Sequence, residues 1–167
     1  SKRRRITGHP MPHTASNARH ALRDLGLAGE LIDAHRPRRK LMRRVMARSA
    51  VALFLHECAD EGVSVLMIRR AEREGDPWSG HMAFPGGRKD KADRNTLATA
   101  LRETEEEVGL RAAGVARLLG RLSDIATHAR LRHGPMVITP YVFSLPERFP
   151  DRKSTRLNSS HLVISYA

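Results

Sequence analysis

The sequence predicts an α/β domain in which strands precede and follow one well-marked helix. Two apolar runs of strand length occupy residues 49–56 and 63–68, and an amphipathic helical pattern occupies residues 96–108. Two further strand-like runs follow at residues 115–125 and 136–145. This order, in a chain of 167 residues, favours a single mixed α/β domain over a helical bundle.

The first 48 residues read as a basic leader, separate from a domain at residues 49–150. Apolar residues recur at mostly helical spacing over residues 16–34, so we expect one or two short helices there. Residues 36–48 mix apolar side chains with seven basic ones and are expected to be helical or to form a linker. The two strands that follow are expected to be neighbours, as in a hairpin.

Most of the net charge of +12, namely +10, belongs to residues 1–50. Residues 1–50 contain 13 Lys or Arg and three acidic residues, whereas residues 51–150 contain 14 of each sign. Aromatic residues make up only 4% of the chain, too few for a surface on which bases stack. The composition therefore predicts non-specific attraction of the leader to polyanions and no specific nucleic-acid partner.

Composition also bounds the compartment. The single cysteine, Cys58, cannot form an internal disulfide, so a reducing cytoplasm is the expected location. No apolar run approaches the roughly 20 residues that cross a bilayer. We therefore expect no membrane partner.

Residues 96–108 carry the clearest helical pattern. Leu97, Leu101, Thr104 and Val108 recur at helical spacing and predict one narrow packing stripe. Gly109 follows directly and is expected to end the helix. The segment before this helix, residues 71–94, is rich in charge, proline and glycine and is expected to be a loop.

Four glutamates crowd the second half of this helix. Glu103, Glu106 and Glu107 fall within about 100° of arc, on the face away from the packing stripe, whereas Glu105 points elsewhere. Arg102 and Arg111 are placed to balance them, and mutual repulsion is expected to hinder their joint ionisation. Such an oxygen-rich cluster suits a hard divalent cation, although an acidic run alone is typical of a solvated helix face.

A glycine pair precedes the helix in the run Phe84-Pro85-Gly86-Gly87. Adjacent glycines allow a backbone to approach a ligand closely and to present amide groups to an anion. The alternative is a plain turn.

Taken together, residues 84–110, FPGGRKDKADRNTLATALRETEEEVGL, resemble the signature of the Nudix hydrolases, G-x5-E-x7-R-E-U-x-E-E-x-G-U, where U is aliphatic. Residues 102–110 match its second half, with Thr104 in an aliphatic position. Asp93 takes the acidic position of the first half, and eight residues instead of seven separate it from Arg102. This spacing is similar to the coenzyme A diphosphatase branch. The resemblance implies a Nudix-type α/β/α sandwich with a mixed sheet, truncated at its C-terminal end.

The resemblance also implies roles for the motif. Glu103, Glu106 and Glu107 would carry Mg²⁺ or Mn²⁺, Arg102 would orient a glutamate of the motif, and the turn at Gly86 and Gly87 would shape the loop. A glutamate or a loop histidine could accept the proton from the attacking water, and Glu106 or Glu107 is favoured over His128.

The expected substrate is a small nucleoside diphosphate derivative, with coenzyme A or acyl-coenzyme A favoured by the motif spacing. Asp76 and Trp78 stand where the branch has Arg and His. Trp78 either stacks on an adenine or covers the core edge, and Arg70 either pairs with phosphate or is a solvated strand end. ADP-ribose or another nucleoside diphosphate derivative is the alternative substrate, and a catalytically silent domain that binds polyanions is the alternative function. Formation of a homodimer stays open.

Residues 151–167 read as a tail foreign to the domain. Residues 151–161 and 164–167 match the translation of a common short-read sequencing adapter. We therefore expect a tail derived from that adapter, with no native packing, and a natural chain interrupted near Pro150.

Overall fold

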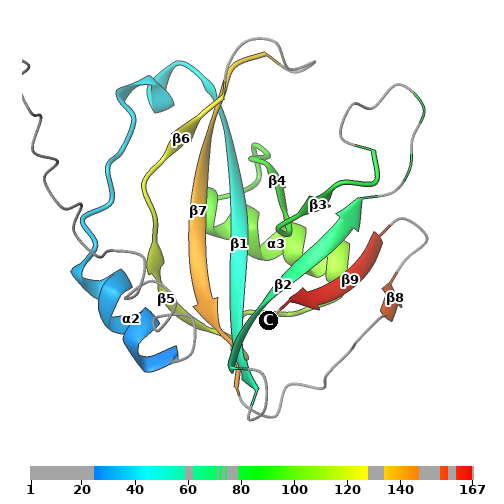
Figure 1. The fold of residues 1–167 in the computed structure, drawn as a ribbon. Coiled ribbons are helices and arrows are strands. Elements are labelled where there is room, and N and C mark those ends of the chain that lie inside the picture. The colour runs from blue at the N-terminus through cyan, green and yellow to red at the C-terminus, as the bar shows by residue number, and fades with distance from the viewer. Residues whose placement is uncertain are drawn as a thin grey trace, which may run out of the picture.

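The computed structural model describes residues 25–58, 62–70, 72, 74, 79–127, 134–146, 155–157 and 161–166. One mixed sheet with helices packed against it forms the body of the protein (Figure 1). The helical elements are α2 (Leu25–Ala34), the short 3₁₀ helix η1 (Leu41–Arg44) and α3 (Thr96–Val108). The strands are β1 (Ala47–Cys58), β2 (Gly62–Arg70), β3 (Met82–Ala83), β4 (Gly86–Arg88), β5 (Arg117–Arg121), β6 (Ile125–Ala126), β7 (Met136–Ser144), β8 (Thr155–Leu157) and β9 (His161–Tyr166).

The sheet is ordered β5-β7-β1-β2-β9-β8, and the short strands β3, β4 and β6 pair with β2, β1 and β7. Strands β1 and β7 run parallel, with Ala47 opposite Met136 at one end and Leu55 opposite Ser144 at the other. The remaining pairs are antiparallel, including the expected hairpin between β1 and β2. A parallel pair needs a long crossover, and here the connection contains α3. The predicted α/β class with a mixed sheet is therefore confirmed.

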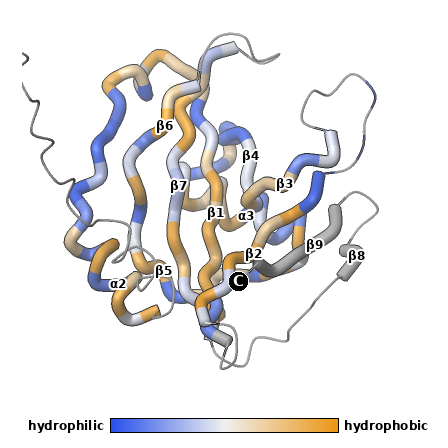
Figure 2. The backbone as a smooth tube through the Cα atoms, viewed as in Figure 1, coloured by the Kyte–Doolittle hydropathy of each residue, from blue (hydrophilic) through white to orange (hydrophobic). Residues whose placement is uncertain are grey.

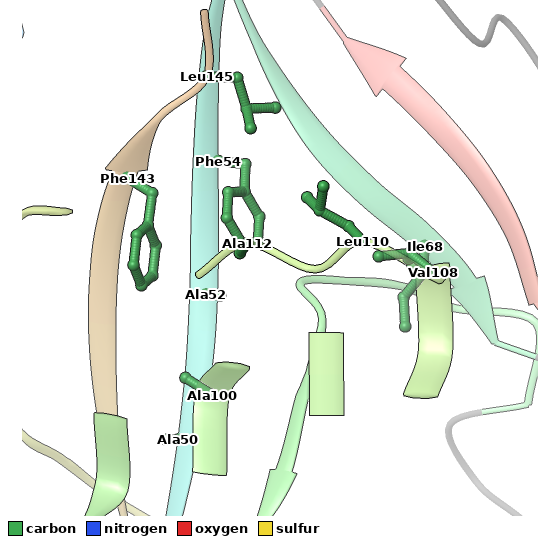
Figure 3. Close-up of a cluster of buried hydrophobic side chains, with 10 residues drawn as sticks. All are labelled: Ala50, Ala52, Phe54, Ile68, Ala100, Val108, Leu110, Ala112, Phe143 and Leu145. Atoms are coloured by element: carbon green, nitrogen blue, oxygen red, sulfur yellow. The ribbon is translucent and has the colours of Figure 1, made fainter. Parts of the chain in front are cut away.

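The core lies between the central strands and α3 (Figure 3). Alternate residues of β1, Ala50, Ala52 and Phe54, are fully buried, as the two-residue period of a strand requires. The ring of Phe54 stacks on Phe143 of β7, with the ring centroids 4.9 Å apart. Small side chains on β1 and at Ala100 let the helix sit close to the sheet. This packing fixes the position of α3 relative to β4.

Helix α3 has the predicted bounds. The side chain of Asn95 caps its first turn by accepting a hydrogen bond from the Ala98 N–H at 2.9 Å. Gly109 ends the helix with φ of 66°, and its N–H donates to the Glu105 carbonyl at 2.9 Å. Both ends are therefore set by local chemistry that the sequence displays.

The buried stripe of α3 differs from the predicted one. Thr99 and Ala100 are fully buried, whereas Leu97 and Leu101 are only partly buried. Thr104 is also fully buried, and its hydroxyl donates to the Ala100 carbonyl at 2.7 Å, which satisfies a polar group in an aliphatic position. The buried face is thus rotated by about one residue, because small side chains face β1 and allow close packing.

This rotation corrects the expected orientation of the acidic face. Glu103 is four residues after Thr99, and Glu107 is seven residues after Ala100. Both therefore border the buried face instead of facing away from it. Of the four glutamates of α3, only Glu105 and Glu106 are exposed.

Other elements depart from their predicted ranges. The strand expected at residues 115–125 is divided into β5 and β6, with an irregularity between Leu118 and Gly120 and with Asp124 turned into the interior. The loop expected at residues 71–94 contains β3 and β4.

The leader is also only partly helical. Helix α2 lies within the predicted range 16–34, of which residues 16–24 are outside the described part of the chain, and it packs against β5. Of the two alternatives for residues 36–48, the structure shows the linker, which contains the short helix η1 and leads into β1.

The expectation that the tail makes no packing is wrong in this structure. Residues of β9 pair with β2, from Tyr166 opposite Val65 to His161 opposite Arg70. Pairing at a sheet edge uses backbone groups, so an apolar stretch such as Leu162-Val163-Ile164, two of whose residues are β-branched, can add there without a matched side-chain surface. The adapter origin of the tail, and the domain boundaries at residues 48 and 150, stay predictions.

Among the described residues, no helix is long and apolar enough to cross a membrane.

Candidate functional site

The glycine pair of β4 is held between β1 and helix α3. Gly86 lies opposite Val51 and Gly87 opposite Ala50 in an antiparallel pairing. A Cβ atom at position 86 would lie 2.7 Å from the Val51 Cα, and one at position 87 would lie 2.6 Å from the Glu103 Oε2. Position 86 therefore needs glycine, because the β1 backbone is too close for a side chain and the φ of Gly86 is 157°. A side chain at position 87 would displace the Glu103 carboxylate. This is a built contact, which rules out the alternative of a plain turn.

Glu107 contacts this backbone directly. The Gly86 N–H donates to the Glu107 Oε2 at 2.9 Å. Burial raises the pKa of Glu107 to about 7, and the nearby charge of Glu103 adds to the rise, while the Gly86 hydrogen bond opposes it. The carboxylate is thus partly removed from water and close to a second acid.

Arg102 is the centre of the acidic cluster. Its Nε and Nη2 donate to Asp93 Oδ1 and Oδ2 at 3.1 and 3.0 Å, a bidentate pair. The same guanidinium reaches Glu103 Oε1 at 2.9 Å and Glu106 Oε2 at 3.0 Å. It also donates to the Arg88 carbonyl at 3.3 Å. One side chain therefore joins the loop after β4 to two glutamates of α3.

Asp93 is the residue whose role sequence reasoning missed. It was placed only as the acidic position of the motif, although its side chain is 6% exposed and holds Arg102. The hydrogen bonds from Arg102 keep the pKa of Asp93 well below its usual range, helped by the Asp90 N–H at 2.9 Å. The available signal was an acid in a glycine-rich loop nine residues before an arginine on the following helix.

The other three glutamates of α3 differ in exposure and in partner, according to their positions around the helix. Burial raises the pKa of Glu103, and Arg102 opposes the rise. Glu106 is 57% exposed at the outer side of Arg102. Glu105 points away from this group and pairs with Arg111 at 2.8 Å. Arg111 thus neutralises Glu105 and not Glu107, contrary to the sequence-based expectation.

The described residues include no group of three Asp, Glu, His or Cys side chains already arranged to hold a metal ion. The Arg102 guanidinium contacts Glu103 and Glu106 and supplies positive charge to the cluster. The donor chemistry nevertheless suits a hard cation, because carboxylate oxygens are the ligands that such ions prefer. Burial raises the pKa values of Glu103 and Glu107, and the charge of a bound cation would oppose that rise.

The predicted substrate residues are only partly placed. Arg70 is exposed at the end of β2, and its charge lowers the pKa of Glu107, which puts it on the same side of the site. Its backbone N–H donates to the His81 carbonyl at 3.0 Å. Asp76, Trp78 and His128 lie outside the described residues.

The Arg102–Asp93 pair generates a prediction on stability. Asp93→Asn should lower the free energy of unfolding by about 3 kcal/mol, because it leaves a partly buried guanidinium without its bidentate partner. Chemical denaturation measures this loss. Because the folded pKa of Asp93 lies below its ordinary 3.8, the difference from wild type should shrink as the pH falls below that value.

A matched control for this variant is Asp90→Asn in the same loop. Asp90 is exposed, and its Oδ1 accepts the Ala92 N–H at 2.9 Å, a bond that asparagine can also make. Equal losses for the two variants would contradict the assignment of the pair.

Burial of Glu107 generates a second prediction, on pH. The folded pKa of about 7 exceeds the ordinary 4.5, so wild type should lose stability as the pH rises from 4.5 to 7. Glu107→Gln cannot ionise, and its amide oxygen can still accept the Gly86 N–H. In buffer with a chelator it should raise the free energy of unfolding by about 2 kcal/mol at pH 8 and change little at pH 4. The exposed Glu105→Gln is the control, and a gain of equal size at both pH values would refute the burial argument.

Comparison with known proteins gives the family. The family model of the NUDIX domain matches residues 46–161. An uncharacterized Nudix hydrolase, NudL, of Yersinia pestis is 35% identical over 103 residues, which are 62% of this chain and 48% of that protein. An uncharacterized protein of Schizosaccharomyces pombe is 39% identical over 84 residues, 49% of this chain and 26% of that protein. The chain thus spans half or less of the length of these relatives.

Solved structures agree on the fold. The NUDIX domain of Shewanella oneidensis NrtR, in complex with ADP ribose, has a TM-score of 0.53 at 17% identity, covering 82% of this chain and 80% of that one. The Caenorhabditis elegans Ap4A hydrolase has the same TM-score and identity, covering 69% and 74%. Together with the glycine pair, the Arg102 cluster and the mixed sheet, the family match shows that this chain belongs to the Nudix domain family.

Proposed function

We propose that this chain hydrolyses a diphosphate bond in a nucleoside diphosphate linked to another group, with Mg²⁺ or Mn²⁺ as cofactor. The observation that carries the proposal is the contact of Glu103 and Glu107 with the glycine pair of β4. That contact assembles acidic side chains of one helix against the closely packed backbone of β4. Membership of the family supports the same reaction class.

The metal ion would be held by Glu103, Glu106 and Glu107. Carboxylate oxygens are the ligands that such hard cations prefer. When bound, the ion would neutralise charge on the diphosphate and lower the pKa of a bound water. Glu103, Glu106 and Glu107 lie on one side of α3, so this chain offers three carboxylates to one such ion.

The protein's own groups position that carboxylate set. Arg102 holds Glu103 and Glu106 in place, and Asp93 holds Arg102 from the other side. The Gly86 N–H holds one oxygen of Glu107 and leaves the other available as a ligand or a proton acceptor. Pre-set positions of this kind reduce the reorganisation that the reaction needs.

The proposed substrate is coenzyme A or its acyl forms, cleaved to phosphoadenosine phosphate and a phosphopantetheine. The spacing from Gly87 through Asp93 to Arg102 supports this choice, because it is similar to that of the coenzyme A diphosphatase branch. Arg70 is exposed, and its charge lowers the pKa of Glu107, which supports a role in pairing with a substrate phosphate.

The carboxylate assignment predicts a graded loss of activity. Glu106→Gln and Glu107→Gln should each lower kcat by at least about 100-fold, because each removes a charged group that acts on the reacting diphosphate. Glu105→Gln is the matched control on the same helix, since it pairs with Arg111 away from the cluster, and should stay near wild type. Steady-state assays that separate phosphoadenosine phosphate from coenzyme A by chromatography measure the three variants. Equal losses at all three positions would refute the assignment, and no activity in wild type would favour a catalytically silent domain.

The substrate assignment predicts a preference. With either Mg²⁺ or Mn²⁺, kcat/KM for coenzyme A should exceed that for ADP-ribose. A tenfold preference for ADP-ribose, about 1.4 kcal/mol of transition-state discrimination, would overturn the coenzyme A assignment and leave the metal chemistry in place.

A further inference from the structure

Residues 38–48, here called the basic–apolar segment, connect α2 to β1 and expose large apolar side chains. Leu41, Met42 and Val45 are 82%, 53% and 80% exposed. Figure 2 shows hydrophobic colour at η1 within an otherwise hydrophilic connection. Single exposed apolar residues are common, but three within five positions of one turn form a patch that water disfavours.

The same segment carries unbalanced positive charge. The side chains of Arg38, Arg39, Lys40 and Arg48 are exposed, and the described part of the chain places no carboxylate in an ion pair with them. The sequence from residue 34 to residue 56 contains no acidic residue. Cations therefore surround the apolar turn without local neutralisation.

The turn is held in place by a buried carboxylate, Asp124. Its side chain is fully buried and accepts from Arg121 at 2.6 Å, Thr139 at 2.9 Å and the Lys40 N–H at 3.0 Å. Arg43 adds an ion pair at 3.5 Å.

The backbone next to Asp124 holds the segment a second time. The Asp124 N–H donates to the Arg38 carbonyl at 2.9 Å, and the Arg38 N–H donates to the Ser123 hydroxyl at 3.0 Å. The exposed side chains are thus presented on a prebuilt scaffold, which reduces the entropy that a binding partner has to overcome.

The charge selects the partner. A second copy would bring the same cations against each other, and residues 1–24 of this chain are themselves basic, with six Lys or Arg and one acidic residue. Nucleic acid would satisfy the cations but gives no apolar surface to Leu41 and Val45. An anionic lipid surface offers both, because phosphate headgroups attract the cations while the interface accepts apolar side chains.

The absence of a spanning apolar run from the sequence predicts no membrane partner, but binding at a membrane surface needs no such span. Against that expectation, we propose that the basic–apolar segment docks the protein on membrane surfaces that contain anionic phospholipid. Leu41, Met42 and Val45 enter the interface, and Arg38, Arg39 and Lys40 contact the headgroups. The segment adjoins the motif loop, where the Lys89 N–H donates to the Arg48 carbonyl at 2.8 Å, so docking brings the loop toward the lipid surface. The inference is independent of the proposed hydrolysis.

The test is co-sedimentation of the full chain with vesicles of phosphatidylcholine alone or mixed with phosphatidylserine. Wild type should bind the mixed vesicles at least about tenfold more strongly, and salt should weaken this binding. The double variant Leu41→Ser/Val45→Ser should lose about tenfold in affinity for the mixed vesicles. The triple variant Arg38→Gln/Arg39→Gln/Lys40→Gln should lose at least as much and show a weaker salt dependence.

The matched control is Leu31→Ser/Val115→Ser, which removes two apolar side chains, 54% and 48% exposed, outside the segment. It should bind vesicles as wild type does. All variants should keep their melting temperatures within a few degrees, because the altered side chains are exposed.

Three outcomes would overturn the proposal. If Leu41→Ser/Val45→Ser binds mixed vesicles as tightly as wild type, the basic leader alone accounts for the attraction. If wild type binds duplex DNA but not vesicles, and only the charge variant weakens that binding, the segment is a polyanion site. If light scattering shows a dimer that only the double variant dissociates, a second copy covers the patch.

Discussion

The bidentate ion pair between Arg102 and Asp93 is the interaction on which the geometry of the site depends. It joins the loop after β4 to α3, and the same guanidinium orients Glu103 and Glu106. A partly buried pair contributes little net stability by itself, since desolvation offsets much of the attraction. The pair mainly fixes positions. Arg102, held by Asp93, leaves the side chains of Glu103 and Glu106 few rotamers to adopt.

Close backbone packing supplies the second constraint. Gly86 and Gly87 fit between β1 and Glu103 because neither carries a side chain, and Ala50 and Ala100 let α3 approach the sheet. The result places Glu103 and Glu107 where burial raises their pKa values. Acidic groups in such surroundings cost stability in the free protein, and binding of the proposed cation would offset that cost. The burial of these carboxylates thus underlies both their cost to stability and their proposed role in binding a cation.

Asp124 organises a second polar centre away from the acidic cluster. Two arginines, a threonine and the backbone of the basic–apolar segment surround it, so every buried oxygen has a partner. Sequence periodicity gave no hint of this centre, because two of its partners, Lys40 and Arg43, lie more than 80 residues before Asp124 in the chain. The same separation hid the division of the predicted strand at residues 115–125.

The sequence by itself determined the features whose cause is local. The bounds of α3 follow from the Asn95 cap and Gly109, the hairpin strands follow from apolar runs, and the motif from Gly86 to Leu110 indicates the family. Tertiary structure decided which face of α3 is buried and that β9 pairs with β2. It also decided the ion pairs of Arg102 with Asp93 and of Arg111 with Glu105. Helical spacing fixes where side chains lie around the helix axis, but packing against β1 decides which face is buried. Thr99 and Ala100 face the sheet because small side chains allow closer contact than the neighbouring leucines do.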